Sequence, residues 1–586
     1  MAQTAAELEA PALVQALAIR ARALPDQVAL IFQGRSGSEA REVTNGQLFR
    51  RVVDLAQELT NRDLVGRRAL ISCHDLETAV GMLLACISAR LVAVPVPALE
   101  SMAYRARLIG IIEDCRPAIA LTDRNERERI KTHDPEMLSR VPVLTLADAS
   151  QAVTAPAEPI PCGAGLAYLQ YTSGSTSAPK GVMITHDCLL AFLSQSARRF
   201  PVHRGTRTVS WLPLYHDWGL IAGVFRPLLF GYPSILMQPM TFIERPMEWL
   251  EAISRHCATI SGGPNFAYEL CTQRISANEI SNLDLSCWEL VQNGSETVRW
   301  SSMQRFFDTF APAGLRLESI CPVYGLAEAT LCVTYGHQTR RRSLTVSREE
   351  LAHGVAEELT APEAAEGGDE LTNLGSPLPG LEVAIVDPAS RQRLPERCVG
   401  EVWVRGHSLA AGYWGRPQET KATFEARLSG QAVGGGYLRT GDLGFLFDGE
   451  LYLTSRLKDI VIVRGQNYYP PDIEATAQEC SPDIRPRRVA VFAEAGTNGE
   501  ELSIAFELRP SVEAVEPIVD EVRRRVARVH GVRPFAIYAL PARSMPMTSS
   551  GKLARQACRQ MVLESSMQLI YKWRVDTHDG ETGAEA

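Results

Sequence analysis

The sequence predicts an α/β fold: a large N-terminal α/β domain of several subdomains, a small β-rich subdomain that closes it, and a small α/β C-terminal domain. Three observations predict it. A chain of 586 residues is too long for one ordinary core. Up to about residue 335, apolar strand-like runs alternate with longer helix-like segments. Beyond about residue 372 the strands become short, and a second α/β pattern begins near residue 457.

Each part of this prediction rests on particular segments. Strands are expected in the large domain at residues 68–73, 91–96, 118–123, 208–213 and 234–239. The β-rich subdomain should hold strands at 382–387, 400–406 and 445–454, the last with Asp448-Gly449 at its centre, a strong hairpin signal. The C-terminal domain should hold strands at 460–463, 488–493, 502–508 and 535–540, and helices that begin near Pro471 and Val515.

The expected boundaries follow from these segments. The large domain should span residues 1–456 and the small one 457–574, with a disordered tail at 575–586. Residues 337–372 differ in composition from their surroundings and look like an exposed, mobile insertion, helix-compatible over 348–359.

Composition excludes several classes of protein. The formal net charge is −8 and no domain is strongly basic, so no nucleic-acid partner is expected. No basic n-region opens the chain and no apolar run approaches about 20 residues, so we expect a cytoplasmic protein without a membrane span. The 13 cysteines are scattered and form no zinc-type cluster, which indicates small buried hydrophobic residues.

The most informative segment is YTSGSTSAPKG at residues 171–181, directly after the apolar run 166–170. Glycine lets backbone N–H groups approach a phosphate closely, hydroxyls add donors, and a lysine adds a point charge. A solvated linker seldom follows an apolar strand and ends in PKG. A Walker loop needs Ser or Thr after the lysine, whereas Gly181 follows it here. The expected phosphate contacts are Thr172, Ser173, Gly174, Ser175, Thr176 and Lys180.

This segment resembles the phosphate loop of the adenylate-forming superfamily, which includes acyl- and aryl-CoA synthetases, luciferases and peptide-synthetase adenylation domains. Its other motifs follow in the same order. VYGLAEAT at 323–330 resembles the Y-G-x-x-E signature, which implies that Tyr324-Gly325 packs on adenine and that Glu328 coordinates Mg²⁺. QNGSETV at 292–298 resembles the loop at the adenine edge, formed by Gly294, Ser295 and Glu296.

The C-terminal motifs extend the resemblance. YLRTGDLG at 437–444 implies that Asp442 accepts both ribose hydroxyls of ATP, and SRLKDIVIVRG at 455–465 implies a nucleotide contact by Arg456. In the same segment Lys458 would be the hinge about which the mobile small domain rotates. Lys552 in MTSSGKLAR resembles the catalytic lysine that bridges the substrate carboxylate and the α-phosphate.

Two further motifs resemble the fatty acyl-AMP ligases, which pass the acyl group to a carrier protein. LPLYHDWGLIAG at 212–223 implies that His216 and Asp217 lie near the reacting carboxylate and that Trp218 and Gly219 line the acyl channel. SGGPNFAYELC at 261–271 would add Asn265 and Phe266. Members more often carry Met where Trp218 stands, so its ring either reshapes the channel or is a core aromatic residue. The insertion at 337–372 lies where these ligases carry theirs.

The sequence therefore predicts a ligase that uses ATP and Mg²⁺ to convert a medium- or long-chain fatty acid into an acyl-adenylate. It would then transfer the acyl group to the phosphopantetheine thiol of an acyl carrier protein. The alternative is a fatty acyl-CoA synthetase; less favoured are a peptide-synthetase adenylation domain and a non-catalytic module. Four arginines on a predicted helix, at 523, 524, 525 and 528, form either a solvated face or a docking patch for an acidic carrier.

Overall fold

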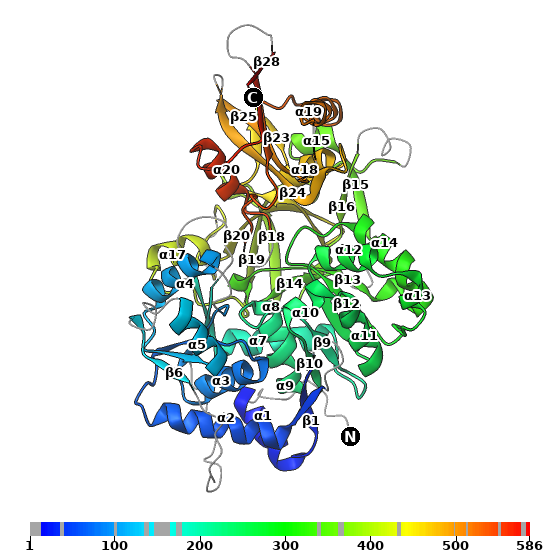
Figure 1. The fold of residues 1–586 in the computed structure, drawn as a ribbon. Helices are drawn as coiled ribbons and strands as arrows, with labels where there is room; N and C mark the ends of the chain where they lie inside the picture. Colours follow the sequence, from blue (N-terminus) through cyan, green and yellow to red (C-terminus); the bar gives the residue numbers. More distant parts are fainter. Residues whose placement is uncertain are drawn as a thin grey trace.

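The structure is a computed structural model and describes residues 13–34, 40–98, 102–133, 140–145, 165–171, 179–336, 341–360, 368–430, 435–496, 499–510, 512, 514–548, 552–575 and 582–585 (Figure 1). Within these ranges no helix has both the length and the apolar character of a membrane span. The α/β class predicted from the sequence is confirmed, with several sheets and helices packed on them.

The first sheet of the large domain has six strands in the order β6-β5-β3-β4-β7-β8. All neighbours are parallel except β7 and β8, which are antiparallel. The strands are β3 (Arg68–Ser72), β4 (Val92–Pro95), β5 (Ile119–Thr122), β6 (Val143–Thr145), β7 (Leu166–Tyr171) and β8 (Gly181–Thr185). Their connections include α2 (Asn45–Thr60), α3 (Leu76–Ser88), α4 (Met102–Cys115) and α5 (Arg124–His133). Such apolar strands, buried on both faces, are typical of parallel sheets.

The second sheet has nine strands in the order β17-β14-β13-β12-β11-β9-β10-β1-β2. Its six central strands, β13 to β1 in that order, are mutually parallel. The strands are β1 (Val28–Phe32), β2 (Arg41–Thr44), β9 (Thr208–Ser210), β10 (Ser234–Leu236), β11 (Ile260–Gly263), β12 (Leu290–Asn293), β13 (Ile320–Gly325), β14 (Cys332–Tyr335) and β17 (Ser376–Pro377).

Helices cover this sheet and join its strands. They are α1 (Leu13–Ala23), α7 (His186–Arg199), α8 (Asp217–Leu220), the π-helical turn Ile221–Phe225, α9 (Arg226–Phe230), α10 (Pro239–Glu244), α11 (Met247–His256), α12 (Asn265–Arg274), α13 (Ala277–Ile280) and α14 (Trp300–Phe310). An aromatic core that includes Trp249, Trp288, Phe306 and Phe310 fixes α11 and α14 on the sheet. Because carboxyl ends of parallel strands meet at one edge, the loops after these strands converge there.

The β-rich subdomain is one antiparallel sheet in the order β18-β19-β20-β21. Its strands are β18 (Leu381–Val386), β19 (Gly400–Gly406), β20 (Leu438–Phe447) and β21 (Glu450–Arg456), and α17 (Pro417–Phe424) packs on β20. The predicted hairpin is confirmed: Asp448 (φ 52°) and Gly449 (φ 74°) form the two-residue turn. The carboxylate of Glu396 accepts both of their backbone N–H groups.

The insertion is not an exposed segment in the part that the structure describes. It forms the hairpin β15 (Ser343–Ser347) and β16 (Gly368–Thr372), and the helix expected at 348–359 extends only over α15 (Arg348–Ala352). Alternate apolar residues of β15 face a core shared with both domains, which composition alone did not reveal. The buried residues of this core are Leu344, Val346, Leu351, Ala356, Leu371, Phe445, Phe447, Tyr452 and Tyr469.

The small domain carries the hairpin β22 (Val461–Val463) and β23 (Gln466–Tyr468) and a sheet in the order β24-β25-β26-β27-β28. That sheet comprises β24 (Ile484–Gly496), β25 (Gly499–Leu508), β26 (Ala536–Leu540), β27 (Tyr571–Val575) and β28 (Thr582–Glu585). The helices predicted near Pro471 and Val515 are α18 (Pro470–Gln478) and α19 (Glu516–His530), and α20 (Arg555–Leu563) follows. Residues 582–585, which lie in the tail for which disorder is expected, pair with β27 as strand β28.

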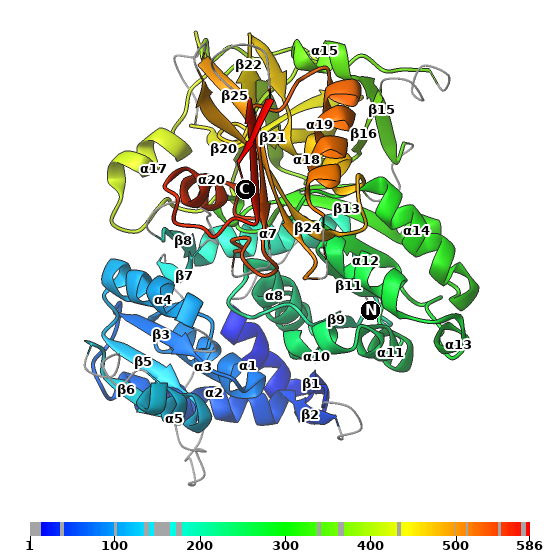
Figure 2. The same cartoon turned by 45° about the horizontal axis from the view of Figure 1, so that its top comes forward.

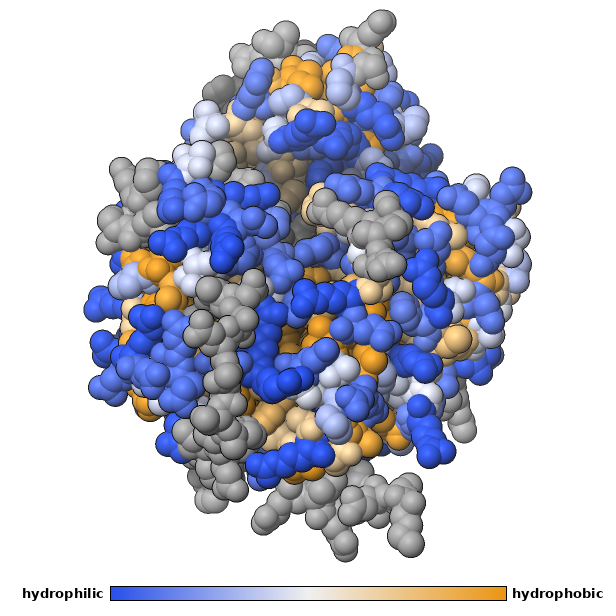
Figure 3. Space-filling view, turned by 60° about the horizontal axis from the view of Figure 1, so that its bottom comes forward, coloured by the Kyte–Doolittle hydropathy of each residue, from blue (hydrophilic) through white to orange (hydrophobic). Residues whose placement is uncertain are grey.

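The small domain and the β-rich subdomain lie at the same end of the large domain (Figures 1 and 2). Helix α8 lies beneath them in the second view. The opposite end presents a mostly hydrophilic face with smaller apolar areas (Figure 3). The small domain thus covers the edge where the loops of the nine-stranded sheet converge.

Candidate active site

The candidate site is built at the carboxyl edge of the nine-stranded sheet. The segments that follow β9, β11 and β12 carry the motif residues His216, Asn265 and Gly294, respectively, and Gly325 is the last residue of β13. Parallel pairing of these strands brings together motifs that lie more than a hundred residues apart in the sequence. Crevices at this edge are the usual ligand sites of open α/β sheets.

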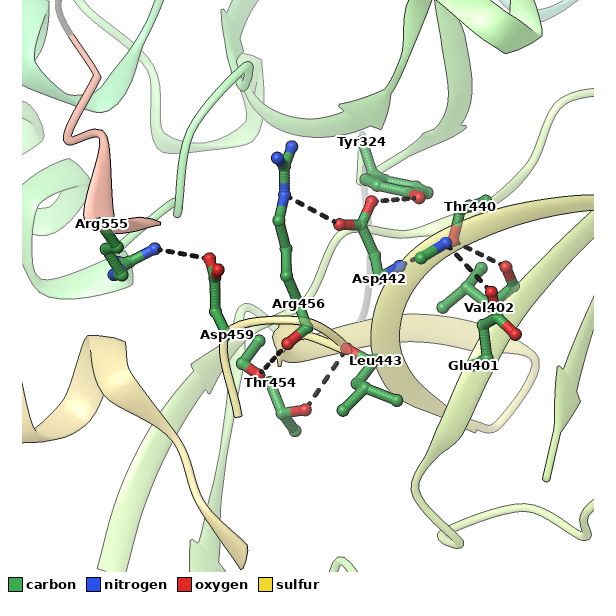
Figure 4. A network of polar contacts seen from close by, with 12 residues as sticks. Tyr324, Glu401, Val402, Thr440, Asp442, Leu443, Thr454, Arg456, Asp459 and Arg555 are labelled. Atoms are coloured by element: carbon green, nitrogen blue, oxygen red, sulfur yellow. Dashed lines mark hydrogen bonds and ion pairs between the residues drawn. The ribbon is translucent and has the colours of Figure 1, made fainter. Parts of the chain in front are cut away.

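Three predicted nucleotide residues form one polar network (Figure 4). The phenol of Tyr324 donates a hydrogen bond to Oδ2 of Asp442 at 2.8 Å, and Nε of Arg456 lies 3.3 Å from Oδ1. Asp442 and Arg456 are direct partners across the β20–β21 ladder. Burial raises the pKa of Tyr324, so its hydroxyl remains a donor, and the charge of Asp442 raises the pKa of Arg456.

Glycine is required at two of the motif positions. A Cβ on Gly325 would lie 1.9 Å from the carbonyl oxygen of Leu331, and one on Gly294 would lie 2.5 Å from a methyl group of Val323. The next residue, Ser295, has a φ of 70°, so the chain turns sharply after β12. The turn places Glu296 beside the start of α12, where its Oε1 accepts the backbone N–H of Phe266 at 2.8 Å.

The side chain of Asn265 is buried and forms hydrogen bonds with three other residues. Its Oδ1 accepts hydrogen bonds from Nδ2 of Asn293 and from the backbone N–H of Arg299, both at 3.1 Å, and its Nδ2 donates to Glu269. The side chain therefore joins α12, the end of β12 and the loop before α14. These contacts fix the frame of the proposed acyl pocket.

His216 and Asp217 form an ion pair at the start of α8. Nδ1 of His216 lies 2.5 Å from Oδ1 of Asp217, and that carboxylate oxygen also accepts a hydrogen bond from the backbone N–H of Trp218 at 2.7 Å. Burial by itself would raise the pKa of Asp217, but His216, the Trp218 N–H and the charge of Lys552 together lower it. Asp217 is thus held as a carboxylate.

Lys552 of the small domain lies close to the large-domain residues. Burial and the charge of Arg456 lower its pKa, while Asp217, Glu296 and Asp442 act in the opposite direction. Its backbone is fixed by two hydrogen bonds with Thr548, at 2.7 and 3.0 Å. The structure therefore brings Lys552 to the site that holds the His216, Gly294 and Asp442 motifs.

The predicted hinge residue Lys458 lies in the short segment between β21 and β22. Burial lowers its pKa, and the neighbouring Arg456 adds to that effect. Its carbonyl accepts a hydrogen bond from Gln556 at 3.1 Å, and Asp459 pairs with Arg555 at 3.4 Å. The segment is thus attached to the small domain on one side and to β21 on the other.

The phosphate side of the site is described only in part. Thr172, Ser173, Gly174, Ser175 and Thr176 lie outside the described residues. Lys180 is described: its Nζ forms an ion pair with Glu419 at 2.5 Å and lies 5.2 Å above the ring of Tyr413.

The hydroxyl of that same tyrosine donates to Oε1 of Glu328 at 2.8 Å. Burial raises the pKa of Glu328, and the hydrogen bond from Tyr413 opposes this. Among the described residues no group of three His, Cys, Asp or Glu side chains could hold a metal ion by itself. The single carboxylate of Glu328 nevertheless fits Mg²⁺, because this ion is usually bound by one or two protein carboxylates together with substrate phosphates.

The expected acyl-pocket aromatic residues occupy different environments. Trp218 is 6% exposed, and its ring lies against Gly262, where an added Cβ would be 2.9 Å from the ring. Gly219 has no room for a side chain, since a Cβ would lie 2.3 Å from the carbonyl of Pro213. Phe266 is half-buried and lies edge-on to Trp211.

Sequence reasoning missed three residues that hold the motif side chains. They are Tyr413, Glu419 and Arg487, which contact Glu328, Lys180 and Glu296, respectively. No local pattern marks any of them, because each lies far in sequence from the residue it contacts.

Comparison with known proteins agrees with this geometry. The family described as AMP-binding enzyme matches residues 17–414. The chain is 36% identical over 566 residues to the medium-chain-fatty-acid–[acyl-carrier-protein] ligase JamA of Moorena producens, with 95% of both chains covered. This chain belongs to the AMP-binding enzyme family, on its fatty acyl-AMP ligase branch.

The ligase is also similar to a second fatty-acid ligase and to a solved structure. It is 36% identical over 542 residues to the long-chain-fatty-acid–AMP ligase FadD26 of Mycobacterium marinum, covering 89% of this chain and 91% of that one. Its fold matches the crystal structure of a fatty acyl-adenylate ligase from L. pneumophila in complex with acyl adenylate and pyrophosphate. That match has a TM-score of 0.70 and 32% identity, and covers 96% and 98% of the two chains. The chain is therefore an acyl-adenylate-forming ligase that uses ATP.

Proposed function

We propose that this ligase activates a medium- or long-chain fatty acid and passes the acyl group to the phosphopantetheine thiol of a holo-acyl carrier protein. The carrier would be a free protein or a domain of a polyketide or peptide synthase. The named activities of JamA and FadD26 support the fatty acid, and that of JamA supports the carrier. The two names differ in chain length, so the length of the acid is part of the test.

In the first step a carboxylate oxygen of the acid attacks the α-phosphorus of ATP. A new O–P bond forms, the bond from that phosphorus to the bridging oxygen breaks, and pyrophosphate leaves with the electron pair. Two anions must approach each other, so a cation between them stabilises the transition state more than the ground state. Lys552 is assigned that role, and its burial within range of the charges of Asp217, Glu296 and Asp442 is the observation that carries the proposal.

The nucleotide would be held by groups of matching chemistry. A carboxylate is a natural acceptor for a diol, so Asp442 is assigned the ribose hydroxyls, with Tyr324 and Arg456 fixing its orientation. Gly294 and Gly325 carry no side chain, so the flat adenine base could lie directly against the backbone at these two positions. Lys180 and residues 172–176 are assigned the β- and γ-phosphates.

Glu328 is the residue assigned to Mg²⁺. When bound, Mg²⁺ neutralises phosphate oxygens and so favours departure of the pyrophosphate. Tyr413 keeps the carboxylate oriented and favours its ionised form. No other described residue is assigned to the metal.

In the second step the carrier thiol attacks the acyl carbonyl. The C–S bond of the thioester forms, the C–O bond to AMP breaks, and the thiol proton passes to solvent. Lys552 belongs to the small domain and is buried, and we infer that this domain rotates to admit the carrier. We assign the rotation to Lys458, with residues 1–456 as the fixed unit and 457–574 as the moving one.

Two measurements on the purified chain test the proposal. The first is mass spectrometry of the adenylate formed with ATP, Mg²⁺ and a mixed fatty-acid pool, together with acid-dependent pyrophosphate release. The second compares holo-carrier protein and coenzyme A at equal concentration as acceptors of preformed adenylate. Absence of fatty acyl-adenylate would contradict the whole proposal. Faster formation of acyl-CoA would identify a fatty acyl-CoA synthetase instead.

A further inference from the structure

A guanidinium of the small domain lies over Phe266, one of the residues expected to line the acyl pocket. Arg487, on β24, pairs with Oε2 of Glu296 at 3.1 Å. Its guanidinium carbon also lies 4.6 Å from the ring centroid of Phe266, which is cation–π geometry. Both partners belong to the large domain, so one side chain joins the two domains at two points.

The contact closes a triangle of three residues. Glu296 uses Oε2 for Arg487 and Oε1 for the backbone N–H of Phe266. Arg487 therefore contacts both the carboxylate of Glu296 and the ring of Phe266, and Glu296 in turn holds the backbone N–H of Phe266. Glu296 is also a charged neighbour of Lys552. The triangle therefore connects the loop after β12, the start of α12 and the domain that carries the catalytic lysine.

The backbone of Arg487 supports a specific role for it. Its φ is 61°, a left-handed conformation that side chains other than glycine rarely adopt. Its N–H donates to Oε1 of Gln478 at 2.9 Å, which fixes this conformation from within the small domain. Such conformations persist where surrounding contacts determine them, and they concentrate at functional positions.

We propose that Arg487 is a positioning residue that holds the small domain in the arrangement that presents Lys552, and that its two contacts must break before acyl transfer. This inference rests on the proposed function, because it assigns the closed arrangement to adenylate formation. It predicts a split between the half-reactions: adenylate formation depends on Arg487, whereas transfer does not.

The test compares Arg487→Ala with Arg509→Ala. Arg509 is a matched control: it is an exposed arginine of the same domain whose Nε donates to the carbonyl of Pro482 in that domain. We expect Arg487→Ala to lower acid-dependent pyrophosphate release about tenfold, the scale for losing one cation–π contact and one partly exposed ion pair. Transfer from preformed adenylate should not be slowed, because the variant lacks the contacts that must break before transfer. Arg509→Ala should leave both steps unchanged.

Arg487→Lys separates the two contacts. Lysine keeps the positive charge opposite Glu296 but lacks the flat guanidinium that stacks on Phe266, so we expect an intermediate loss of about threefold. A variant that merely disturbed folding would not be rescued in this graded way.

Hydrogen exchange of the unliganded chain gives a readout that needs no activity. The amide of Phe266 is held by Glu296, so Arg487→Ala should speed exchange in the peptide around residues 264–268, and Arg509→Ala should not. Unchanged exchange, or equal losses in both half-reactions, would overturn the inference. A parent enzyme that formed no fatty acyl-adenylate would contradict the proposed function instead, and the exchange result would still decide the role of Arg487.

Discussion

The phenol of Tyr324 and the carboxylate of Asp442 meet at 2.8 Å, although they belong to different subdomains of the large domain. Tyr324 lies near the end of β13 in the nine-stranded sheet, and Asp442 lies on the β20–β21 hairpin. This hydrogen bond links the two walls of the proposed nucleotide site, and Arg456 extends it toward the hinge. The site is thus a junction of three structural units.

Removing the lysine cation should affect chemistry far more than nucleotide binding. We expect Lys552→Ala to lower adenylate formation by roughly 10²–10³-fold, the scale for losing one electrostatic stabiliser of a transition state. ATP affinity should change little, because Tyr324 and Asp442 are intact. Acid-dependent pyrophosphate release and calorimetric ATP binding check both parts, with Lys421→Ala, an exposed lysine on α17, as the control. Near-normal pyrophosphate release by Lys552→Ala would remove this lysine from the mechanism.

The hydroxyl of Tyr413 should control the pH dependence of the metal step. Burial raises the pKa of Glu328 and the Tyr413 hydroxyl lowers it, so Tyr413→Phe should raise that pKa further. Because Mg²⁺ requires the carboxylate, activity should then be lost at higher pH than in the parent as pH falls. The Mg²⁺ concentration for half-maximal rate should also rise, by roughly threefold to tenfold for one lost hydrogen bond.

Profiles of rate against pH and against Mg²⁺ check the Tyr413 prediction. Tyr437→Phe is the matched control, since its hydroxyl donates to Glu382 elsewhere in the same subdomain. If the rate of Tyr413→Phe falls at the same acidic pH as the rate of the parent, Glu328 is not the residue that binds Mg²⁺.

The acyl chain should contribute strongly to specificity. Each buried methylene is worth about 0.8 kcal/mol, so acetate should be a very poor substrate beside a medium or long acid. Specificity constants for acids of increasing length test this. A flat profile would contradict a fatty-acid substrate.

Trp218→Met should move the preferred acid toward longer chains if the indole limits the channel. The ring is buried against Gly262, so replacing it with a flexible thioether frees volume at that depth. An unmoved optimum, with a lowered melting temperature, would identify Trp218 as a core aromatic residue.

The arginine-rich helix α19 offers a smaller docking patch than the sequence indicated. Arg525 pairs with Glu479, and Arg523 pairs with Asp520 and lies over Trp573. Arg524 is the most exposed of these three, at 69% of its side chain. Reversal of Arg525 would place a carboxylate beside Glu479, at the end of a different helix, whereas reversal of Arg524 does so only beside Glu521, at an exposed pair within α19; Arg524→Glu is therefore the cleaner probe.

If α19 steers an acidic carrier, Arg524→Glu should slow acyl transfer severalfold through association, and high salt should reduce the difference. Adenylate formation should be unaffected, because it needs no carrier. Arg22→Glu, on α1 of the large domain, is the control. Equal transfer rates for Arg524→Glu and the parent would assign α19 to a solvated face.

Much of the architecture could be predicted because it depends on local patterns. Short apolar runs such as residues 68–73 favour buried strands, and Asp448-Gly449 between two such runs favours a tight turn. Motif residues such as Tyr324, Asp442 and Lys552 could be identified because their neighbours in sequence carry the signal. The structure then brings them to one edge of one sheet.

The supporting residues could not be predicted, for a physical reason. Tyr413 contacts a residue 85 positions away, and Arg487 contacts one 191 positions away in the other domain. A tyrosine after glycine or an arginine beside arginine has no distinctive local environment. The burial of one face of the insertion could not be predicted for the same reason. The residues that cover this face come from β20, β21 and the start of the small domain.

The ion pair of Lys180 with Glu419 has a consequence for the turnover cycle. In the proposed reaction a triphosphate must take this lysine from a carboxylate that already neutralises it. A nucleotide without β- and γ-phosphates leaves the pair intact, so the pair reduces the advantage of ATP over AMP in binding. When pyrophosphate departs, Lys180 pairs with Glu419 again. This ion pair offsets part of the attraction between Lys180 and pyrophosphate that would otherwise slow release of the product. Glu419 would thus act as an internal competitor, and Glu419→Gln should strengthen inhibition by pyrophosphate.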